Sequence, residues 1–475
     1  MDFRYAVDWN PPALHSYRAN VNDPESKHYF LGSVNAYLSK VLSGSKAANI
    51  APVGGIEFIS AGSPCPGFSD MQINKLSVQS MQHASLVASV VAFVDVYNPQ
   101  YLVLENVVSM TKPIGPEKQS VFSQILAASV ALGYQVQQFQ VDAWSHASPQ
   151  QRSRIFIVAR VPGLKPLEAP PLSHDHPSDK VVKLRRLGKT SGGVPFGSRR
   201  DEYTPFPHVS PQQATADLPD IGDSMPQICP TFPDHRTPTE EGFKSRERMA
   251  RIPVYPHGLG LARSVGDNKP IASGEAREWF DGQTGLRGLP NSKTYTRVDP
   301  TGLFPTFLTA LQIADGKNSQ TLHWEQPRSL SIMEVKRGFG YLDDDVLVGA
   351  PATQMKILGN SVDRHAALVL GLAIKDSWTA GQKNGIEETQ APLHTPRTSP
   401  TPGPPAAHAT HDWETMSTST STDGPANPAL ASILRERQAI RAGGFAVINK
   451  MLNAQARMGM LDGEEEAQIS SGMSL

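Results

Sequence analysis

Cysteine is scarce in this chain, whose 475 residues include only Cys65 and Cys229. Two cysteines exclude a disulfide framework and a zinc cluster built from cysteine, and free thiols suit a reducing compartment, the nucleus or the cytosol. An excess of charge is also absent, because 44 Lys and Arg face 45 Asp and Glu. This balance neither supports nor excludes a nucleic-acid partner, since one groove can be basic on a neutral chain.

Long hydrophobic runs are absent as well. The longest apolar stretches, residues 86–94 and 366–374, are far too short to span a bilayer, so we expect no membrane partner. With 39% hydrophobic residues, the chain is nevertheless long enough to form one large or two medium domains.

Short apolar, β-branched runs alternate with stretches of helical spacing in the first 160 residues. The runs that predict buried strands are residues 5–7, 56–59, 101–104 and 155–158. Between them, residues 80–97 and 120–132 carry apolar side chains at helical spacing. Strand and helix in alternation predict an α/β fold with a parallel sheet covered by helices on both faces.

Changes in composition predict four segments. We expect residues 1–160 to form the α/β lobe and residues 161–327, where Pro and Gly are frequent, to form an irregular second domain. Helical patterning returns in residues 328–378, which we expect to rejoin the first lobe. Residues 379–475 are of low complexity and predict a disordered tail, in which residues 429–461 could form an isolated or partner-binding helix.

The first candidate site residue is Cys65, which lies between Pro64 and Pro66 after the predicted strand at 56–59. Two prolines would hold the thiol in a stiff turn at the carboxyl edge of the sheet, where open α/β sheets bind ligands. A small buried thiol in a tight turn explains the pattern equally well. This motif alone leaves both interpretations open.

Further polar groups at strand ends favour a site. Glu105 follows the strand predicted at 101–104, where a carboxylate is either a capping group or a functional acid. Gln150, Arg152 and Arg154 lead into the last strand, and alternate residues of an extended segment share a face, so we expect the three to point the same way. A solvated basic edge is the alternative. Cysteine, acid and arginine at the strand ends of one sheet predict a shared pocket.

These motifs resemble those of the cytosine-5 DNA methyltransferases. Residues 64–69, Pro-Cys-Pro-Gly-Phe-Ser, resemble the family's Pro-Cys motif, residues 105–107 its Glu-Asn-Val motif, and residues 150–154 its Gln-x-Arg-x-Arg motif. Residues 328–339 and 354–362, the latter with Gly-Asn-Ser-Val, resemble the last two motifs. The matches follow the family order, and the first motif together with the Pro/Thr-rich tail resembles fungal enzymes.

The resemblance implies a Rossmann-like sheet that binds S-adenosylmethionine and methylates C5 of a cytosine flipped out of double-stranded DNA. Cys65 would be the nucleophile that adds to C6 of the base. Glu105 would hold and protonate N3, Arg154 would bond O2, and Arg152 would steady the loop and the phosphate.

Residues 161–327 would be the target-recognition domain. The residues expected to contact DNA are Gln150, Lys180, Lys183, Arg185 and Arg186. A solvated loop is the alternative for the four basic residues.

Cofactor contacts also follow from the resemblance. Asp8 and Trp9 match the acid that bonds the ribose hydroxyls and the aromatic residue that packs on adenine. Ser33 stands where the family usually has an Asp that contacts the adenine. The other contacts implied for the cofactor fall on Pro64, Asn360, Ser361 and Val362.

The family's first strand, with a Phe-x-Gly-x-Gly loop that cradles the methionine part of the cofactor, has no match before Tyr5. That strand lies in the middle of the family's sheet, so its absence would leave unpaired backbone groups on its neighbours. The chain is either a fragment of a longer enzyme, which we favour, or a natural short form. We expect the chain alone to bind the cofactor poorly.

Two other functions remain open. A transfer-RNA cytosine-5 methyltransferase would use the same scaffold, but the RNA-acting relative has a compact segment where this chain has residues 161–327. A catalytically impaired DNA- or chromatin-binding fragment, or a degenerate copy, would keep the motifs without activity. For a protein that acts on DNA we expect a nuclear location and a chromatin recruiter bound through the C-terminal tail.

Overall fold

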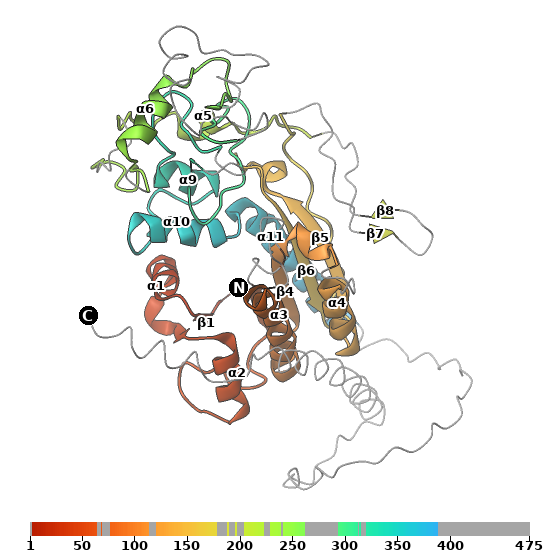
Figure 1. The fold of residues 1–475 in the computed structure, drawn as a ribbon. Coiled ribbons are helices and arrows are strands. Elements are labelled where there is room, and N and C mark those ends of the chain that lie inside the picture. Colours follow the sequence, from red (N-terminus) through yellow and green to blue (C-terminus); the bar gives the residue numbers. More distant parts are fainter. Residues whose placement is uncertain are drawn as a thin grey trace, which may run out of the picture.

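The computed structural model describes residues 2–63, 68, 77–113, 120–177, 188–189, 195–196, 204–222, 229–238, 241–261, 293–311, 313–314 and 320–387. Its centre is a four-stranded sheet in the order β3-β4-β6-β5 (Figure 1). The strands are β3 (Phe58–Gly62), β4 (Tyr101–Val107), β5 (Gln135–Asp142) and β6 (Ser153–Arg160).

The sheet is mixed, which corrects the prediction of a parallel sheet. β3 and β4 are parallel, but β6 is antiparallel to both β4 and β5. The connection between β5 and β6 is short and contains only the 3-10 helix η3 (Ala143–His146). A parallel pair needs a crossover of about a dozen residues or more, usually a helix, so this short link returns the chain antiparallel.

Helices cover both faces of the sheet. α3 (Val78–Tyr97) and α4 (Val121–Ala131) pack on one face in a single apolar cluster with β4 and β6. α11 (Arg364–Glu387) packs on the other face, where Leu370 lies in one cluster with Val103 of β4. Because β4 is buried on both faces, its first four residues are all apolar.

The N-terminal strands form a separate sheet. β1 (Tyr5–Asp8) and β2 (His28–Leu31) pair in parallel, and α2 (Val34–Leu42) packs against them in a cluster that includes side chains of β3 and α3. The rings of Phe3 and Phe58 lie 5.6 Å apart. Within the described residues no strand joins β1 to β3, so both sheets rest on the same helices without pairing.

Serine and asparagine side chains begin several helices. Ser33, Ser77 and Ser120 each accept a hydrogen bond from the backbone N–H three residues later, at the starts of α2, α3 and α4. Asn10 does the same for α1 (Pro11–Asn20). These caps satisfy backbone donors that a helix start leaves unpaired, which explains why the predicted helices at 80–97 and 120–132 begin near these residues.

The other described helices lie above the sheet in Figure 1, except α10, which lies to the left of its upper part. They are α5 (Pro211–Thr215), α6 (Phe243–Arg251), α9 (Ile332–Gly338) and α10 (Pro351–Asn360). A short pair, β7 (Gly188–Lys189) and β8 (Pro195–Phe196), forms a sheet of its own, and the 3-10 helices η1 (Pro24–Ser26) and η2 (Val108–Thr111) complete the elements of the described residues. α9 and α10 pack on Phe304 and Phe307. Asn20 at the end of α1 exchanges two hydrogen bonds, of 2.8 and 2.7 Å, with the backbone of Val346, which ties β1 to this upper part.

Residues 351–381 are long and apolar enough, by length and composition, to cross a membrane. The stretch is α10 and most of α11, separated at Ser361, and its Leu358 and Leu370 pack inside two core clusters. We therefore assign it to the core of the protein. Of the predicted tail, residues 388–475 lie outside the described residues, as does the helix predicted at 429–461.

Candidate active site

The carboxyl end of β4 carries Glu105, which pairs in register with Gly62, the last residue of β3. The Glu105 Oε1 atom lies 2.9 Å from Nε of Arg154, which enters from the neighbouring strand β6. A side chain added at Gly62 would lie 3.9 Å from Glu105 Oε2. One carboxylate oxygen therefore faces the arginine, and the other faces the end of β3.

Burial governs the chemistry of this pair. The side chains of Glu105 and Arg154 are only 14% and 13% exposed. Burial raises the pKa of Glu105, while Arg154 and the more distant Arg152 oppose the shift only in part. The site therefore holds a carboxyl group that takes up a proton more readily than a surface glutamate.

The next residue, Asn106, fixes the start of the loop that carries the candidate thiol. Its Nδ2 donates a hydrogen bond of 2.7 Å to Ser63 Oγ, and its side chain is 1% exposed. Cys65 and Pro64 lie outside the described residues, but Cys65 follows Ser63 by only two positions. Sequence reasoning missed Asn106 as a site residue, although an amide inside an otherwise apolar strand was a signal.

Arg152 has a structural position. Its side chain is buried at 2% exposure, and its guanidinium donates to the carbonyls of Phe307, Gly359 and Ser361 at 3.4, 3.2 and 2.6 Å. The ring of Phe339 lies 4.8 Å from its central carbon. Arg152 thus holds three distant segments beside Arg154, and we assign it as a positioning residue; a phosphate contact does not fit its burial.

Gln150 lies just before β6, which begins only at Ser153, so residues 150–152 are not part of a regular strand. Gln150 is fully buried, and its Nε2 donates to the carbonyl of Gly338 at 3.3 Å, next to the Phe339 ring that faces Arg152. Its burial does not fit a direct contact with DNA.

Asp8 and Trp9 lie at the carboxyl end of β1. Asp8 Oδ1 accepts a hydrogen bond of 2.7 Å from the backbone N–H of Asn10, and burial raises the pKa of its carboxyl group. The Trp9 indole is 67% exposed, and Lys356 Nζ of α10 lies 5.5 Å from its ring centre. The structure thus places the acid and aromatic ring predicted for the cofactor next to α10.

The predicted turn at Asn360, Ser361 and Val362 follows α10 directly. Gly359 allows the turn to approach the backbone of Leu308, because an added Cβ would lie 2.4 Å from its carbonyl. The Ser361 hydroxyl bonds the Tyr341 hydroxyl at 2.8 Å, whereas Asn360 is exposed and Val362 packs in the core. Ser33 lies at the start of α2 and caps it.

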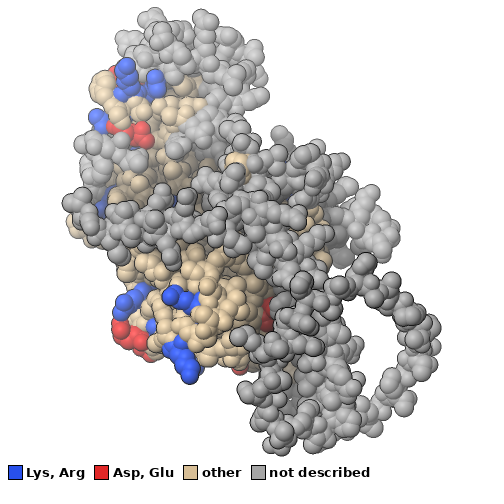
Figure 2. All heavy atoms as spheres, turned by 60° about the horizontal axis from the view of Figure 1, so that its bottom comes forward, with Lys and Arg blue, Asp and Glu red and all other residues tan. Residues whose placement is uncertain are grey.

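The predicted basic contacts Lys180, Lys183, Arg185 and Arg186 lie outside the described residues. Figure 2 shows one face of the molecule, on which the described Lys and Arg side chains gather at its upper left end and near its lower end, with acidic side chains beside them. No group of three or more His, Cys, Asp or Glu in the described parts of the chain could hold a metal ion.

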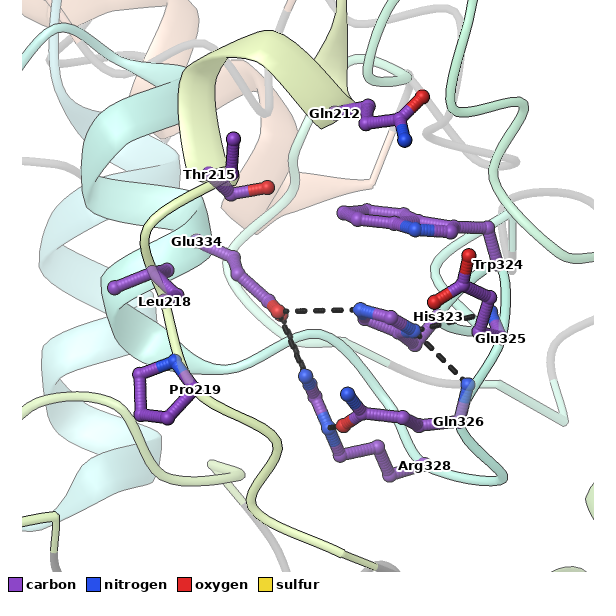
Figure 3. Close-up of a pocket in the computed structure, with 11 residues that line it drawn as sticks. Gln212, Thr215, Leu218, Pro219, His323, Trp324, Glu325, Gln326, Arg328 and Glu334 are labelled. Carbon is purple, nitrogen blue, oxygen red and sulfur yellow. Dashed lines mark hydrogen bonds and ion pairs between the residues drawn. The ribbon is translucent and has the colours of Figure 1, made fainter.

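A pocket of about 150 Å³ lies between α5 and residues 323–328, away from Glu105 (Figure 3). The buried charged groups that line it, Arg328 and Glu334, are paired with each other. Arg328 donates to both oxygens of Glu334 at 2.9 and 2.7 Å, and His323 Nε2 lies 3.5 Å from Glu334 Oε1. Burial lowers the pKa of His323 to about 3, so the ring stays neutral. We infer that this cluster, a buried polar junction, stabilises the fold.

This junction predicts loss of stability in acid. Burial alone would raise the pKa of Glu334, but Arg328 outweighs it and lowers the pKa to about 2, from an ordinary value of 4.5. A depressed pKa stabilises the fold above pH 4.5, and this contribution is lost as the pH falls toward 2. In urea unfolding at neutral pH, Glu334→Gln is expected to lower the free energy of unfolding by about 3–5 kcal/mol, because Arg328 loses its buried carboxylate partner.

Asp217→Asn provides the control, since the Asp217 side chain is 63% exposed in its pair with Arg337. Asp217→Asn should lower the free energy of unfolding by less than about 1 kcal/mol. Equal stability of the Glu334 variant and the wild type would show that the buried pair contributes nothing.

The sequence profile of the family described as "C-5 cytosine-specific DNA methylase" matches residues 1–375. The chain is 25% identical over 423 residues to DNA (cytosine-5)-methyltransferase 4 of Arabidopsis thaliana, covering 79% of this chain and 27% of the relative. It is 27% identical over 355 residues to DNA (cytosine-5)-methyltransferase 1A of Oryza sativa subsp. japonica, covering 71% and 23%.

DNA (cytosine-5)-methyltransferase 1 of Mus musculus is 25% identical over 438 residues, covering 78% of this chain and 26% of the relative. The chain thus spans about a quarter of the length of these relatives.

Proposed function

Because the chain belongs to the C-5 cytosine-specific DNA methylases, we propose that it transfers a methyl group from S-adenosylmethionine to C5 of cytosine in double-stranded DNA. The contact between Glu105 and Arg154 carries this proposal. N3 and O2 are adjacent atoms on one edge of cytosine. A carboxyl group and a guanidinium whose atoms lie 2.9 Å apart match that edge, with the acid at N3 and the arginine at O2.

Cys65 supplies the nucleophile. Its thiolate adds to C6, and the electron pair of the C5–C6 double bond moves to C5, while Glu105 gives a proton to N3. The raised pKa of Glu105 suits this role, because its carboxyl group holds a proton more readily than that of an ordinary glutamate. After C5 is methylated, loss of the C5 proton to solvent restores the double bond and expels the thiolate, and N3 returns its proton to Glu105.

The target base reaches these groups only outside the stacked duplex, so base flipping, at a cost of a few kcal/mol, belongs to the proposal. Residues 161–327 would grip the DNA and read its sequence, and Lys180, Lys183, Arg185 and Arg186 would contact phosphates. A nuclear location and a chromatin recruiter bound through the tail complete the proposed function.

S-adenosylmethionine supplies the electrophilic methyl group. The described residues fit the adenosine half of this cofactor: the Asp8 carboxylate would hold the ribose hydroxyls, the exposed Trp9 ring would cover the adenine, and Ser33 would bond its amine. Asn360, Ser361 and Val362, with Pro64, would border the cofactor on the side of the base. The described residues supply no strand between β1 and β3 to cradle its amino-acid half.

This partial fit predicts weak cofactor binding by the chain alone. Calorimetry with S-adenosylmethionine is expected to show no binding tighter than about 0.1 mM, or about −5.5 kcal/mol. Trp9→Ala should abolish whatever heat remains, which assigns that heat to the proposed site. A micromolar dissociation constant for the wild-type chain would contradict the expected weak binding of S-adenosylmethionine.

Hydrogen exchange at C5 tests the chemistry without the cofactor. Addition of Cys65 to C6 makes C5 basic, so C5 takes a proton from water and reversal of the addition releases the original hydrogen. A duplex that carries [5-³H]cytosine should therefore lose tritium to water in the presence of the chain. Cys65→Ser should abolish this release, and Glu105→Gln should slow it about 10²–10⁴-fold, because the amide cannot give up a proton.

Cys229→Ser is the matched control, since it removes the other thiol and should leave the rate unchanged. Tritium release that survives Cys65→Ser would contradict the proposal. Binding of duplex without any release would favour the scaffold alternative, and faster release from transfer RNA than from DNA would favour the RNA alternative.

A further inference from the structure

α11 is apolar on both of its sides. Ala366, Leu370 and Ile374 recur every four positions, are each 3% exposed, and pack on the central sheet. Leu368 and Leu372, also four positions apart, are 59% and 49% exposed. At about 100° per residue, the two leucines stand on the side of the helix directly opposite the buried stripe. A helix that is apolar all round is normally covered on both sides.

The uncovered side of α11 has the shape of a surface on which another helix docks. Beside the two leucines lie Ala367, which is exposed, and Gly371, where an added Cβ would meet no atom within 4 Å. Two small residues beside two large ones let the backbone of a second helix approach closely. We call Ala367, Leu368, Gly371 and Leu372 the outer stripe of α11.

The size of the outer stripe limits what can occupy it. The stripe extends over about two helical turns, whereas stable interfaces between separate chains bury roughly 1,000 Å² or more. A segment of the same chain needs less area, because a short tether gives it an effective concentration of about a millimolar. The outer stripe therefore suits an occupant that is tethered to α11 itself.

The sequence beyond α11 contains a segment with a matching apolar side. In residues 445–458, which lie outside the described residues, apolar and polar side chains recur at helical spacing. The apolar ones share one side of the predicted helix (Phe445, Ile448, Met451 and Leu452), and the polar ones share the other (Asn449, Lys450, Asn453 and Arg457). A single helix of this length is marginal in water, so its apolar side needs a surface to pack on.

The length of the intervening chain fits a return to α11. Residues 388–444, in which Pro, Thr and Ser are frequent, connect Glu387 at the end of α11 to Phe445. A random-coil linker of this length spans about 40 Å on average. Along the helix, the distance from Glu387 back to Leu372 is about 23 Å. The linker is thus long enough to reach the outer stripe and too short to dilute the segment.

We propose that residues 445–458 form a helix that docks on the outer stripe of α11 in the same chain, with Ile448 and Leu452 against Leu368 and Leu372. The tail thereby covers the side of α11 that faces away from the sheet. A recruiter that binds this segment has to compete with α11 for its apolar side. The docking itself does not depend on the proposed function.

Hydrogen exchange of the full chain, followed by mass spectrometry, tests the proposal. Docking is expected to slow the exchange of amides in residues 445–458 at least about tenfold relative to an unstructured peptide. Replacing both leucines of the outer stripe, by Leu368→Ser with Leu372→Ser, should restore the unstructured rate. Ile448→Ser should do the same from the other side of the contact, and it leaves α11 itself unchanged.

Leu42→Ser is the matched control, because Leu42 is 69% exposed on α2 and its replacement should leave the exchange of residues 445–458 unchanged. A wild-type segment that exchanges like an unstructured peptide overturns the proposal. Protection that survives both the outer-stripe variant and Ile448→Ser also overturns it, because the segment then packs elsewhere. Protection that is lost on tenfold dilution assigns the outer stripe to a second copy of the chain and overturns docking within one chain.

Discussion

One buried cation holds together the segments around the candidate active site. Arg152 gives its guanidinium donors to carbonyls of Phe307, Gly359 and Ser361, which come from two segments more than 150 positions away in the sequence. Such a cation is favourable in the interior only when its donors are satisfied. The two segments must therefore close around it, and this closure fixes the strand that carries Arg154.

The contact between Glu105 and Arg154 depends on that frame. A buried carboxyl group tends to keep its proton, whereas a neighbouring guanidinium favours the ionised form. At Glu105 burial prevails, and the pKa is raised although the arginine lies 2.9 Å away. This balance suits a group that must take up a proton and pass it to a base that arrives beside the same arginine.

The sequence predicted those helices and strands that depend on residues close together in the chain. The apolar run in β4 and the serine caps of α3 and α4 appear as short patterns, and both helices were predicted within a few residues. The sequence also predicted that Glu105 and Arg154 share a pocket, because both stand at strand ends and strand ends at one edge of a sheet lie close together. The family motifs also indicated candidate cofactor contacts near α10, which the periodicity of apolar residues did not indicate.

The predictions that failed concern features that depend on contacts between residues far apart in the sequence. The antiparallel direction of β6 follows from a short link after β5, a strand that was not predicted. Gln150 was expected to contact DNA, yet it is fully buried, in a segment that precedes the regular strand. The buried Arg297 donates to backbone carbonyls of Met249, Ile252, His323 and Gln326, and nothing close to it in the sequence indicated these contacts.

The central claim is that Glu105 is a proton-holding acid beside Arg154, and the carboxyl titration of Glu105 tests it directly. NMR of protein labelled with ¹³C at the glutamate carboxyl carbons, with Glu105→Gln to assign the signal, gives this value. The account predicts a midpoint above the ordinary 4.5. A midpoint at or below 4.5 would mean that the arginine keeps the carboxylate ionised, and would contradict the role of Glu105 as the acid.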